Sequence, residues 1–426
     1  MSNRLDIIVY GATGYTGKRV IQTLHEIVTK EKRHLTLGIA GRSSRKLQDL
    51  LRELEGDRGE NYQQMPMVIA DSKNEASLLE MASNARLVIN CTGPYKFHGE
   101  PVVRACIRQS CHYIDVSAEP QFMERIQLLY NREAALGGVF VVSACGVDSI
   151  IADMGLDFLQ KKFNGTLNSA ECYMELLPED GTFGTGPIMN YTTWESLLHV
   201  LSDYAQLKKI RTKLFKQLPN LEPKLSLKRL PHKVPMSENF AVPYPGIDAT
   251  VMRRSQRYFY EKSQARPVQL HTYMATSKLW HVLLVSINFL LLVLLSKLRF
   301  CINLFLKNPK LFTLGMCSVG PHRKDTNNLQ LITTLYGRGW KGEIVDESYK
   351  KPEDGWIVVK IKGRDPYEIT AICATVSALV LLDQSQKLPE TGGVYTPPPC
   401  FTGTNLVDLL QRNGLQFEMC AAGDLK

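Results

Sequence analysis

Short apolar runs alternate with amphipathic stretches along the first 143 residues of the chain. Six of these runs are rich in β-branched residues and have the length of strands, and segments long enough for helices separate them. Their apolar positions are continuous rather than alternating, which is typical of strands covered on both faces. The pattern predicts an α/β fold with a doubly wound parallel sheet of the Rossmann type. The expected strands are 5–10, 35–40, 67–70, 87–89, 113–116 and 139–143.

A glycine-rich loop follows the first expected strand and leads into a stretch with helical spacing. Gly11 is expected to permit a tight turn, Gly14 to let the backbone approach a phosphate, and Gly17 to let the helix pack on the strand. The N-terminus of such a helix has free N–H groups that bind anions. The loop therefore predicts a pyrophosphate site, with contacts from Gly11, Thr13, Gly14, Tyr15, Thr16 and Gly17.

The residues after the second expected strand distinguish between the two nicotinamide cofactors. A protein that binds NAD usually has an Asp or Glu here for the ribose 2′-hydroxyl. This chain has Arg42 and Ser43 and no acid. Because a guanidinium can bind a phosphate through two parallel hydrogen bonds, the pair predicts a 2′-phosphate site and favours NADP(H) over NAD(H). The alternative is that Arg42 only caps or solvates the following helix.

Two further loops lie where the carboxyl ends of the strands should meet the cofactor. Asp71, after the third strand, is expected either to contact the adenine rim or to cap the next helix. The loop after the fourth strand should lie beside the nicotinamide half, where its small residues allow close approach and its proline stiffens the turn. This loop adds Cys91, Thr92, Gly93 and Pro94 to the expected cofactor contacts.

Two residues are candidates for a catalytic or substrate-binding role. The hydroxyl of Tyr95 is expected to reach a substrate or, alternatively, to belong to a packed aromatic, which is the commoner arrangement. Asp148 starts an apolar helical stretch, so it is expected to contact substrate or ribose or, alternatively, to act as an N-cap. No residue stands out in the sequence as a general acid or base.

A chain of this length exceeds what one hydrophobic core usually organises, so two domains are expected. The Rossmann domain is placed at 1–148 and an α+β domain for substrate or dimerisation at 149–426. Near the end, Pro397 lies in a stretch with the composition of a turn, and it is expected to bar regular helix there. Further strands are expected at 170–176, 268–274, 329–335 and 356–361, and helices at 189–204 and 366–382.

Two stretches of the second domain are unusual for a soluble dehydrogenase. Segment 208–233 contains nine basic residues and one acid, Glu222. A hydrophobic insertion at 279–316 begins with an uncharged run, 279–296, which is at the lower limit for a membrane span. Its basic flanks favour a hairpin or an interfacial segment drawn to anionic lipid headgroups. The alternative is a buried core helix.

Net charge and the spacing of the cysteines limit the partners and the metal sites that can be expected. The 426 residues include 51 Lys and Arg against 42 Asp and Glu, a net charge of +9, which suits an anionic cofactor or an anionic lipid. We expect no nucleic-acid partner, and a homodimer is one expected assembly. The ten cysteines include no CxxC pair, so reduced thiols and no metal site are expected. No signal peptide is expected at the start, so the protein is not expected to be secreted.

Several stretches carry a family resemblance as an ordered set, at 9–17, 40–43, 90–95, 99–103, 115–122, 146–149, 253–258 and 392–397. In these stretches, and nearly end to end, the chain resembles the saccharopine dehydrogenase-like oxidoreductases. The resemblance implies a Rossmann oxidoreductase associated with membranes or lipid droplets. More distantly, the chain is similar to enoyl reductases of glycolipid synthesis. Ile151 departs from the family pattern, in which proline tends to follow the Asp-Ser pair.

These observations predict an NADP(H)-dependent oxidoreductase that acts on a lipid or other hydrophobic substrate. We expect it at the cytosolic face of a membrane or on a lipid droplet, and glycolipid metabolism is one expected setting. Hydride would pass between substrate and a nicotinamide placed near residues 92–95. The alternative is a non-catalytic lipid-droplet or membrane protein that keeps the Rossmann fold for cofactor sensing or scaffolding.

Overall fold

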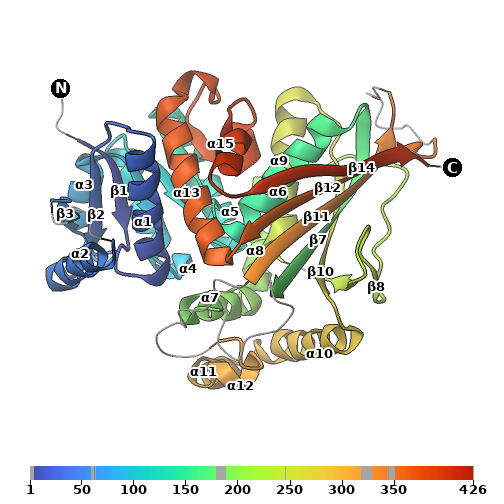
Figure 1. Ribbon diagram of the computed structural model, residues 1–426, viewed down its shortest axis with the longest axis horizontal. Helices are drawn as coiled ribbons and strands as arrows, with labels where there is room; N and C mark the ends of the chain where they lie inside the picture. Colours follow the sequence, from blue (N-terminus) through green and yellow to red (C-terminus); the bar gives the residue numbers. More distant parts are fainter. Residues whose placement is uncertain are drawn as a thin grey trace.

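Two seven-stranded sheets stand side by side in the molecule, with helices packed on them and between them (Figure 1). The computed structural model describes residues 4–58, 62, 64–178, 189–244, 246–317, 329–342, 344 and 351–425. For residues 57, 58, 148, 178, 204, 205 and 299 it describes the backbone alone. A separate group of helices lies below both sheets in the view of Figure 1.

The first sheet is parallel throughout and contains all six strands expected from the sequence. In space the order is β13-β6-β5-β4-β1-β2-β3, so the direction of winding reverses between β1 and β4. In a Rossmann fold the dinucleotide binds at this reversal, beyond the carboxyl ends of the strands. The strands are β1 (Leu5–Tyr10), β2 (Leu37–Gly41), β3 (Met67–Ile69), β4 (Ala85–Asn90), β5 (His112–Asp115), β6 (Phe140–Val142) and β13 (Gly393–Tyr395).

The seventh strand, β13, comes from near the end of the chain and pairs in parallel with β6. Residues 1–148 therefore do not complete the sheet by themselves. The expectation of a turn with no regular helix at 392–397 is wrong, because β13 occupies that stretch and a short helix, α14 (Pro397–Phe401), follows it. Proline suits the first position of a helix, where its missing N–H would have had no partner.

Helices cover both faces of the first sheet. One face packs against α1 (Tyr15–Lys30), α2 (Ser44–Arg58) and α13 (Pro366–Asp383), and α13 also contacts α1 directly. The other face packs against α3 (Glu75–Ser83), α4 (Tyr95–Arg108) and α5 (Pro120–Leu136). This arrangement explains why the strands are apolar throughout, as a sheet with two buried faces requires.

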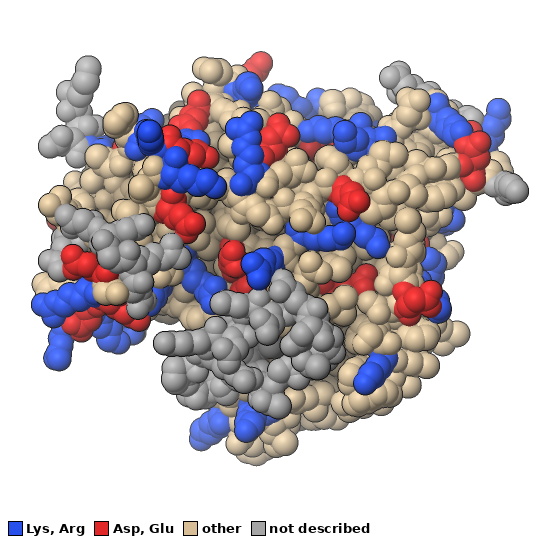
Figure 2. Space-filling view, viewed as in Figure 1, with Lys and Arg blue, Asp and Glu red and all other residues tan. Residues whose placement is uncertain are grey.

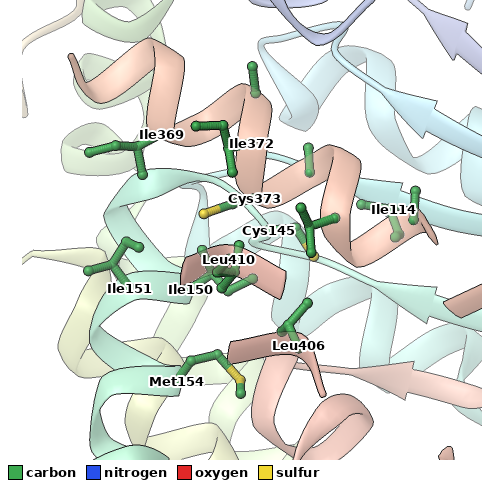
Figure 3. Packing of buried hydrophobic residues seen from close by; sticks show 14 of the residues in the cluster. Ile114, Cys145, Ile150, Ile151, Met154, Ile369, Ile372, Cys373, Leu406 and Leu410 are labelled. Carbon is green, nitrogen blue, oxygen red and sulfur yellow. The ribbon is translucent and has the colours of Figure 1, made fainter. Parts of the chain in front are cut away.

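Helix α13 crosses the sequence boundary between the two expected domains, because it belongs to the second half and covers the first sheet. It is the one described helix long and apolar enough to cross a membrane by length and composition, and 72% of it is buried inside the protein. Its Ile372 and Cys373 pack with Ile150 of α6 (Val147–Lys162) and Leu410 of α15 (Leu406–Arg412) (Figure 3). Burial on this scale is typical of a core helix.

The second sheet is mixed and has the order β14-β12-β11-β7-β10-β9-β8. Strands β7 and β10 pair in parallel, and the other pairs are antiparallel. Helices α6 and α9 (Ile247–Ser263) pack on one face of it. The strands are β7 (Thr166–Pro178), β8 (His232–Lys233), β9 (Phe240–Pro243), β10 (Gln269–Thr276), β11 (Leu329–Trp340), β12 (Gly355–Arg364) and β14 (Gln416–Asp424).

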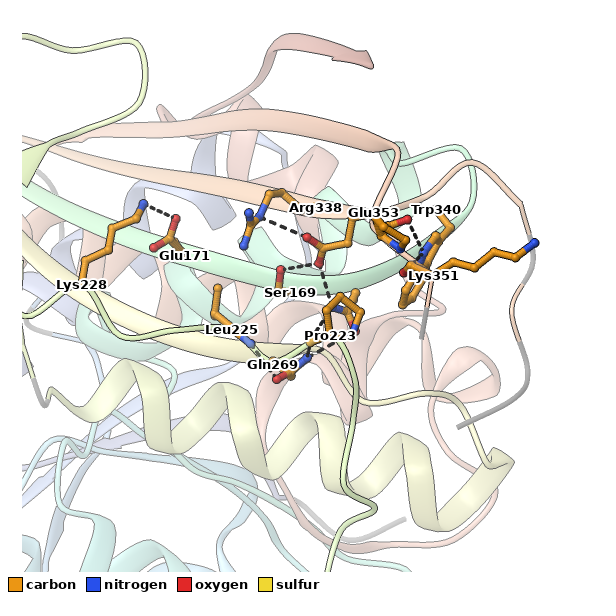
Figure 4. Close-up of polar contacts among 12 residues, drawn as sticks. Ser169, Glu171, Pro223, Leu225, Lys228, Gln269, Arg338, Trp340, Lys351 and Glu353 are labelled. Carbon is orange, nitrogen blue, oxygen red and sulfur yellow. Dashed lines mark hydrogen bonds and ion pairs between the residues drawn. The ribbon is translucent and has the colours of Figure 1, made fainter. Parts of the chain in front are cut away.

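The opposite face of the second sheet carries polar side chains, and residues 216–231 run across it as a strap between α8 (Tyr204–Leu214) and β8. The carbonyl of Pro223 accepts hydrogen bonds from Asn168 (3.0 Å) and Gln269 (2.8 Å). Gln269 in turn accepts one from the backbone N–H of Leu225 (3.0 Å; Figure 4). The strap is therefore fixed to β7 and β10 by polar contacts.

The basic segment 208–233 has more acidic partners in the fold than its sequence suggested. In the sequence only Glu222 lies among its nine basic residues. In the fold, acids from outside the segment pair with three of these cations. The pairs are Arg211 with Glu124 of α5, Lys228 with Glu171 of β7, and Lys233 with Glu238.

The hydrophobic insertion forms three helices at the foot of the molecule, next to α7 (Tyr191–Ser202) (Figure 1). They are α10 (Leu279–Leu295), α11 (Arg299–Lys307) and α12 (Pro309–Phe312). In α10 only Val282 and Leu292 are buried, which rules out the alternative of a buried core helix. We call the exposed side chains of this insertion the apolar platform: Leu279, Trp280, Leu283, Leu284, Ile287, Leu290, Leu291, Leu294, Leu298, Phe300, Leu304, Leu311 and Leu314.

Candidate functional site

The glycine loop joins β1 to α1 at the point where the sheet reverses its winding. Gly11 has φ +81°, a left-handed conformation that favours glycine. A Cβ on Gly17 would lie 2.2 Å from the carbonyl oxygen of Gly11, so only glycine lets the helix start so close to the loop. Gly14 is the N-cap and provides no side-chain cap. The first turn of α1 is therefore open to an anion, as a pyrophosphate site requires.

The other expected residues of this loop are placed at its rim. Thr13 is exposed and Thr16 is half-buried. The hydroxyl of Tyr15 accepts a hydrogen bond from Arg19 (2.7 Å), and its ring packs edge-on against Tyr367 of α13, with centroids 4.9 Å apart. The second half of the chain thus supports the cofactor loop directly.

Arg42 lies at the end of β2, where it is exposed and has no ion pair with any residue that the structure describes. The register of β2 and β3 pairs Gly41 with Ile69, which places Arg42 beside the turn that contains Asp71 and Lys73. Arg42 and Lys73 therefore bring two positive charges together at this edge. Such a pair suits the dianionic 2′-phosphate of NADP(H).

His98 of α4 belongs to the same edge and was not expected from the sequence. Its Nδ1 lies 2.8 Å from the hydroxyl of Ser72. Burial lowers the pKa of His98, and the positive charges of Lys73 and Arg42 lower it further. Lys73 could have been found, since it follows the expected loop residue Asp71. His98 could not, because it reaches this edge only through the packing of α4.

Asp71 closes a turn rather than capping a helix. Its carboxylate accepts a hydrogen bond from the backbone N–H of Lys73 (3.0 Å). The cap of α3 is Asn74, whose side chain accepts from the N–H of Ser77 (3.3 Å). Burial raises the pKa of Tyr10 to about 12, and the negative charge of Asp71 contributes to this shift. A contact between Asp71 and the adenine rim stays a prediction.

The loop after β4 lies against the glycine loop. The hydroxyl of Thr92 is buried and has no hydrogen-bond partner among the described residues, and a Cβ on Gly11 would lie 2.5 Å from it. Burial raises the pKa of the Cys91 thiol to about 12, so this cysteine is not a thiolate. Pro94, joined to Gly93 by a cis peptide bond, is the N-cap of α4. The free hydroxyl of Thr92 suits a contact with a bound ligand.

Tyr95 is packed in the core. Its side chain is 6% exposed, its hydroxyl donates to the carbonyl of Asn90 (2.8 Å), and its ring packs on Phe122. Burial raises its pKa well above the usual value. This placement favours the packed aromatic over a hydroxyl that reaches substrate.

Asp148, the other catalytic candidate, lies in the first turn of α6, and its side chain is outside the described part of the chain. The N-cap of α6 is Gly146, so the alternative of Asp148 as the N-cap is wrong. Its contact with substrate or ribose stays a prediction.

Two buried carboxylates that the sequence did not single out hold these loops in place. Asp115, at the end of β5, accepts hydrogen bonds from Ser117 (hydroxyl, 2.7 Å), Ser143 (3.0 Å) and the N–H of Ala144 (3.0 Å). Burial raises its pKa, whereas the hydrogen bonds from Ser117 and Ala144 lower it. An acid at the end of an otherwise apolar strand was the signal available in the sequence.

Glu119 plays the same part at the start of α4. Its carboxylate accepts from the backbone N–H groups of Tyr95 and Lys96 and from the hydroxyl of Ser196, each at 2.8 Å. Ser196 belongs to α7, so this acid joins the loop after β4 to a helix of the second half. Burial raises the pKa of Glu119, and the three donors lower it.

The glycine cradle, the free hydroxyl of Thr92 and the cationic edge at Arg42 together fit a dinucleotide with a 2′-phosphate. Comparison with known proteins identifies the family. The human protein named saccharopine dehydrogenase-like oxidoreductase is 34% identical over 98% of both chains. This chain belongs to the saccharopine dehydrogenase-like oxidoreductase family. The lipid droplet localized protein of Caenorhabditis elegans is 32% identical over 99% of this chain and 100% of its own.

Two further comparisons concern the cofactor domain and the fold. Residues 7–142 match the family described as saccharopine dehydrogenase NADP binding domain. The first domain of this family member therefore binds NADP(H), which confirms the predicted cofactor. The contacts of Arg42 and Ser43 with the 2′-phosphate stay a prediction. Saccharopine dehydrogenase (L-Glu forming) from Saccharomyces cerevisiae has the same fold, with a TM-score of 0.56 and 14% identity over 98% of this chain and 100% of its own. Bound NADP(H) supplies hydride chemistry, and the chain's own residues bind and orient it.

Proposed function

We propose that the protein is an NADPH-dependent oxidoreductase that acts on a lipid or other hydrophobic substrate while bound to a membrane or lipid-droplet surface. The observation that carries the proposal is the apolar platform on α10, α11 and α12. Exposed apolar surface of this extent usually marks an interaction site. Membership of an oxidoreductase family and the NADP(H) site support the chemical part of the proposal.

The charges around the platform favour a lipid layer with anionic headgroups as its partner. No acidic residue occurs between Glu261 and Asp325 in the sequence. The exposed lysines near the platform are Lys278, Lys297, Lys307 and Lys310. On the face shown in Figure 2, the lower edge is mostly uncharged, and the charges at its lowest rim are basic. Apolar side chains bordered by lysines are typical of a helix that lies in a lipid interface.

The length of α10 argues for binding along the surface. Its 17 residues span about 26 Å at about 1.5 Å per residue, less than the roughly 30 Å of a bilayer core. Three short helices in succession cover more lipid surface when they lie flat. The name of the worm relative, which places that protein on lipid droplets, supports a single lipid monolayer as the partner surface.

The non-catalytic alternative also has an observation in its favour. The hydroxyl of Tyr95 donates to a backbone carbonyl within the core, so it is not available as a proton donor. NADPH oxidation by the purified protein, measured with fractionated cellular lipids, distinguishes the two functions. A lipid fraction that is reduced at the expense of NADPH supports the enzyme. Tight NADPH binding without turnover on any fraction supports sensing or scaffolding.

Lipid binding is tested by vesicle flotation. The triple variant Ile287→Gln, Leu290→Gln and Leu294→Gln replaces three exposed residues of α10 on one helical face. Because burial of each such side chain contributes about 1.5–3 kcal/mol, we expect the affinity for phosphatidylserine-containing vesicles to fall at least about 100-fold. Leu136→Gln changes a still more exposed leucine at the end of α5 and should have no effect. Equal flotation of the triple variant and the wild type would contradict the proposal.

A further inference from the structure

Helix α7 lies between the cofactor domain and the hydrophobic insertion (Figure 1). It belongs to the second half of the chain, yet several of its side chains contact loops of the first sheet. Others pack against α10 and α11. The two sets of contacts lie on opposite sides of one helix of twelve residues. Helix α7 can therefore transmit a change between the cofactor site and the hydrophobic insertion.

The first set of contacts reaches the loop after β4. The methyl group of Thr192 lies 3.3 Å from the position of a Cβ on Gly93. Ser196 donates to the Glu119 carboxylate that also holds the start of α4 (2.8 Å). At the end of α7, the carbonyl of Val200 accepts from Gln121 of α5 (2.9 Å). The helix is thus fixed along its length beside the expected nicotinamide position.

A second connection leads from the start of α7 to the glycine loop. The backbone N–H of Asn190, its N-cap, donates to the hydroxyl of Tyr367 (2.7 Å). The ring of Tyr367 packs on Tyr15, the first residue of α1. The position of α7 is therefore linked to both loops that form the cofactor site.

The second set of contacts lies in the insertion. Trp194 is 1% exposed, and its indole N–H donates to the carbonyl of Phe305 in α11 (3.2 Å). Trp194 and Leu198 form one buried cluster with Phe305 and with Leu292 of α10. The hydroxyl of Tyr191 donates to the carbonyl of Leu306 (3.3 Å). The inner side of the insertion is therefore built on α7, and its outer side is the apolar platform.

We propose that α7 couples lipid binding to cofactor binding, so that the protein binds NADPH more tightly on a lipid surface than in solution. The proposal rests on the proposed lipid binding of the platform. Lipid contact orders α10 and α11, and their shared core with α7 then holds that helix in place over Gly93 and Glu119. A site whose neighbouring helix is already ordered loses less conformational entropy when ligand binds. Lipid binding is therefore expected to increase the affinity of the protein for NADPH.

Coupling of this kind is reciprocal. If vesicles increase the affinity for NADPH by some factor, NADPH must increase the affinity for vesicles by the same factor. Coupling between two sites in proteins typically amounts to about 5- to 150-fold in affinity. We expect at least about a fivefold lower Kd for NADPH when vesicles saturate the protein.

The experiment measures two quantities on the full chain. NADPH binding is followed by cofactor fluorescence with and without phosphatidylcholine vesicles that contain phosphatidylserine, and vesicle binding is measured independently by flotation. A wild-type protein that floats with vesicles but has the same Kd for NADPH in both conditions overturns the coupling and leaves the proposed lipid binding intact. A wild-type protein that does not float overturns the lipid binding itself, and the coupling with it.

A matched pair of variants on α7 tests the route. Ser196→Ala removes the hydrogen bond to Glu119. Ser202→Ala removes bonds to the carbonyl of His199 and to the carboxylate of the adjacent Asp203, and none to Glu119. We expect both variants to float like the wild type. For each variant, the Kd for NADPH without vesicles is divided by the Kd with vesicles. This ratio should fall toward one in Ser196→Ala and stay at the wild-type level in Ser202→Ala. An unchanged ratio in Ser196→Ala would overturn the assignment of the route to this contact.

Discussion

At the scale of single residues, the cationic edge beside β2 and β3 concentrates charge from three separate elements. Arg42 follows β2, Lys73 follows β3, and His98 belongs to α4. Burial lowers the pKa of His98, and the positive charges of Lys73 and Arg42 lower it further, so all three effects favour the neutral imidazole. A phosphate bound at this edge would contact two permanent cations, Arg42 and Lys73. Its negative charge would also favour the protonated form of His98.

The first prediction concerns selectivity between cofactors. Arg42→Ala removes a charged donor, and hydrogen bonds to charged groups contribute about 1.5–3 kcal/mol, so the Kd for NADPH should rise about 10- to 100-fold. The Kd for NADH should be unchanged, because NADH lacks the 2′-phosphate. Titrations of both cofactors measure these values. Arg52→Ala, on an exposed part of α2, serves as the control. Equal weakening of both cofactors would contradict the assignment of Arg42.

At the scale of elements, the glycine loop and α1 form one unit whose geometry depends on atoms in near contact. The Gly11 carbonyl lies where a Gly17 side chain would begin, and the Thr92 hydroxyl lies where a Gly11 side chain would begin. The loops after β1 and β4 therefore lie close together, with the Thr92 hydroxyl beside the backbone of Gly11. This close approach places the anion-binding end of α1 beside the expected nicotinamide position.

The second prediction compares two glycines in neighbouring helices. Gly17→Ala places a Cβ 2.2 Å from a backbone oxygen, so the loop or α1 must shift. We expect a lower melting temperature and loss of most NADPH affinity. Gly56→Ala in α2 meets no atom within 4 Å, and alanine at such a position stabilises a helix by up to about 1 kcal/mol. Calorimetry measures the melting temperature of both variants, and titration measures their affinity for NADPH. Normal NADPH affinity in Gly17→Ala would contradict this account of the loop.

At the scale of the whole molecule, the first sheet depends on the end of the chain. Strand β13 completes its edge, and α13 covers one of its faces. Helix α7 then joins the same sheet to the hydrophobic insertion. The cofactor domain is thus continuous in space but discontinuous in sequence.

The third prediction follows from that discontinuity. A fragment of residues 1–148 lacks β13 and α13, so the apolar face that packs on α13 would be exposed to water. We expect the fragment to unfold without cooperativity in urea and to bind NADPH at least about tenfold more weakly than the full chain. Co-expression with residues 149–426 should restore binding. A fragment that unfolds cooperatively and binds NADPH with the full-length Kd would show that the domain is autonomous.

Sequence reasoning succeeded where the relevant contacts are local. Strands, glycine loop and the first turn of α1 depend on periodicity and on residues a few positions apart, and all six predicted strands of the first sheet are present. The preference for NADP(H) was readable from Arg42 and the missing acid, since a Rossmann fold brings this position to the ribose. The exposure of α10 agreed with the prediction from its uncharged, mostly apolar sequence and its basic flanks.

The tertiary structure alone decided the features that depend on residues far apart in the chain. A three-residue strand such as β13 and a helix such as α13 carry no sign of the sheet that they join. The same is true of the acids that pair with the basic segment, of the burial of Tyr95, and of the position of α7. Burial and ion pairing are properties of neighbours in space. Periodicity and spacing describe only neighbours in sequence, so they determined the cofactor loop and not what packs around it.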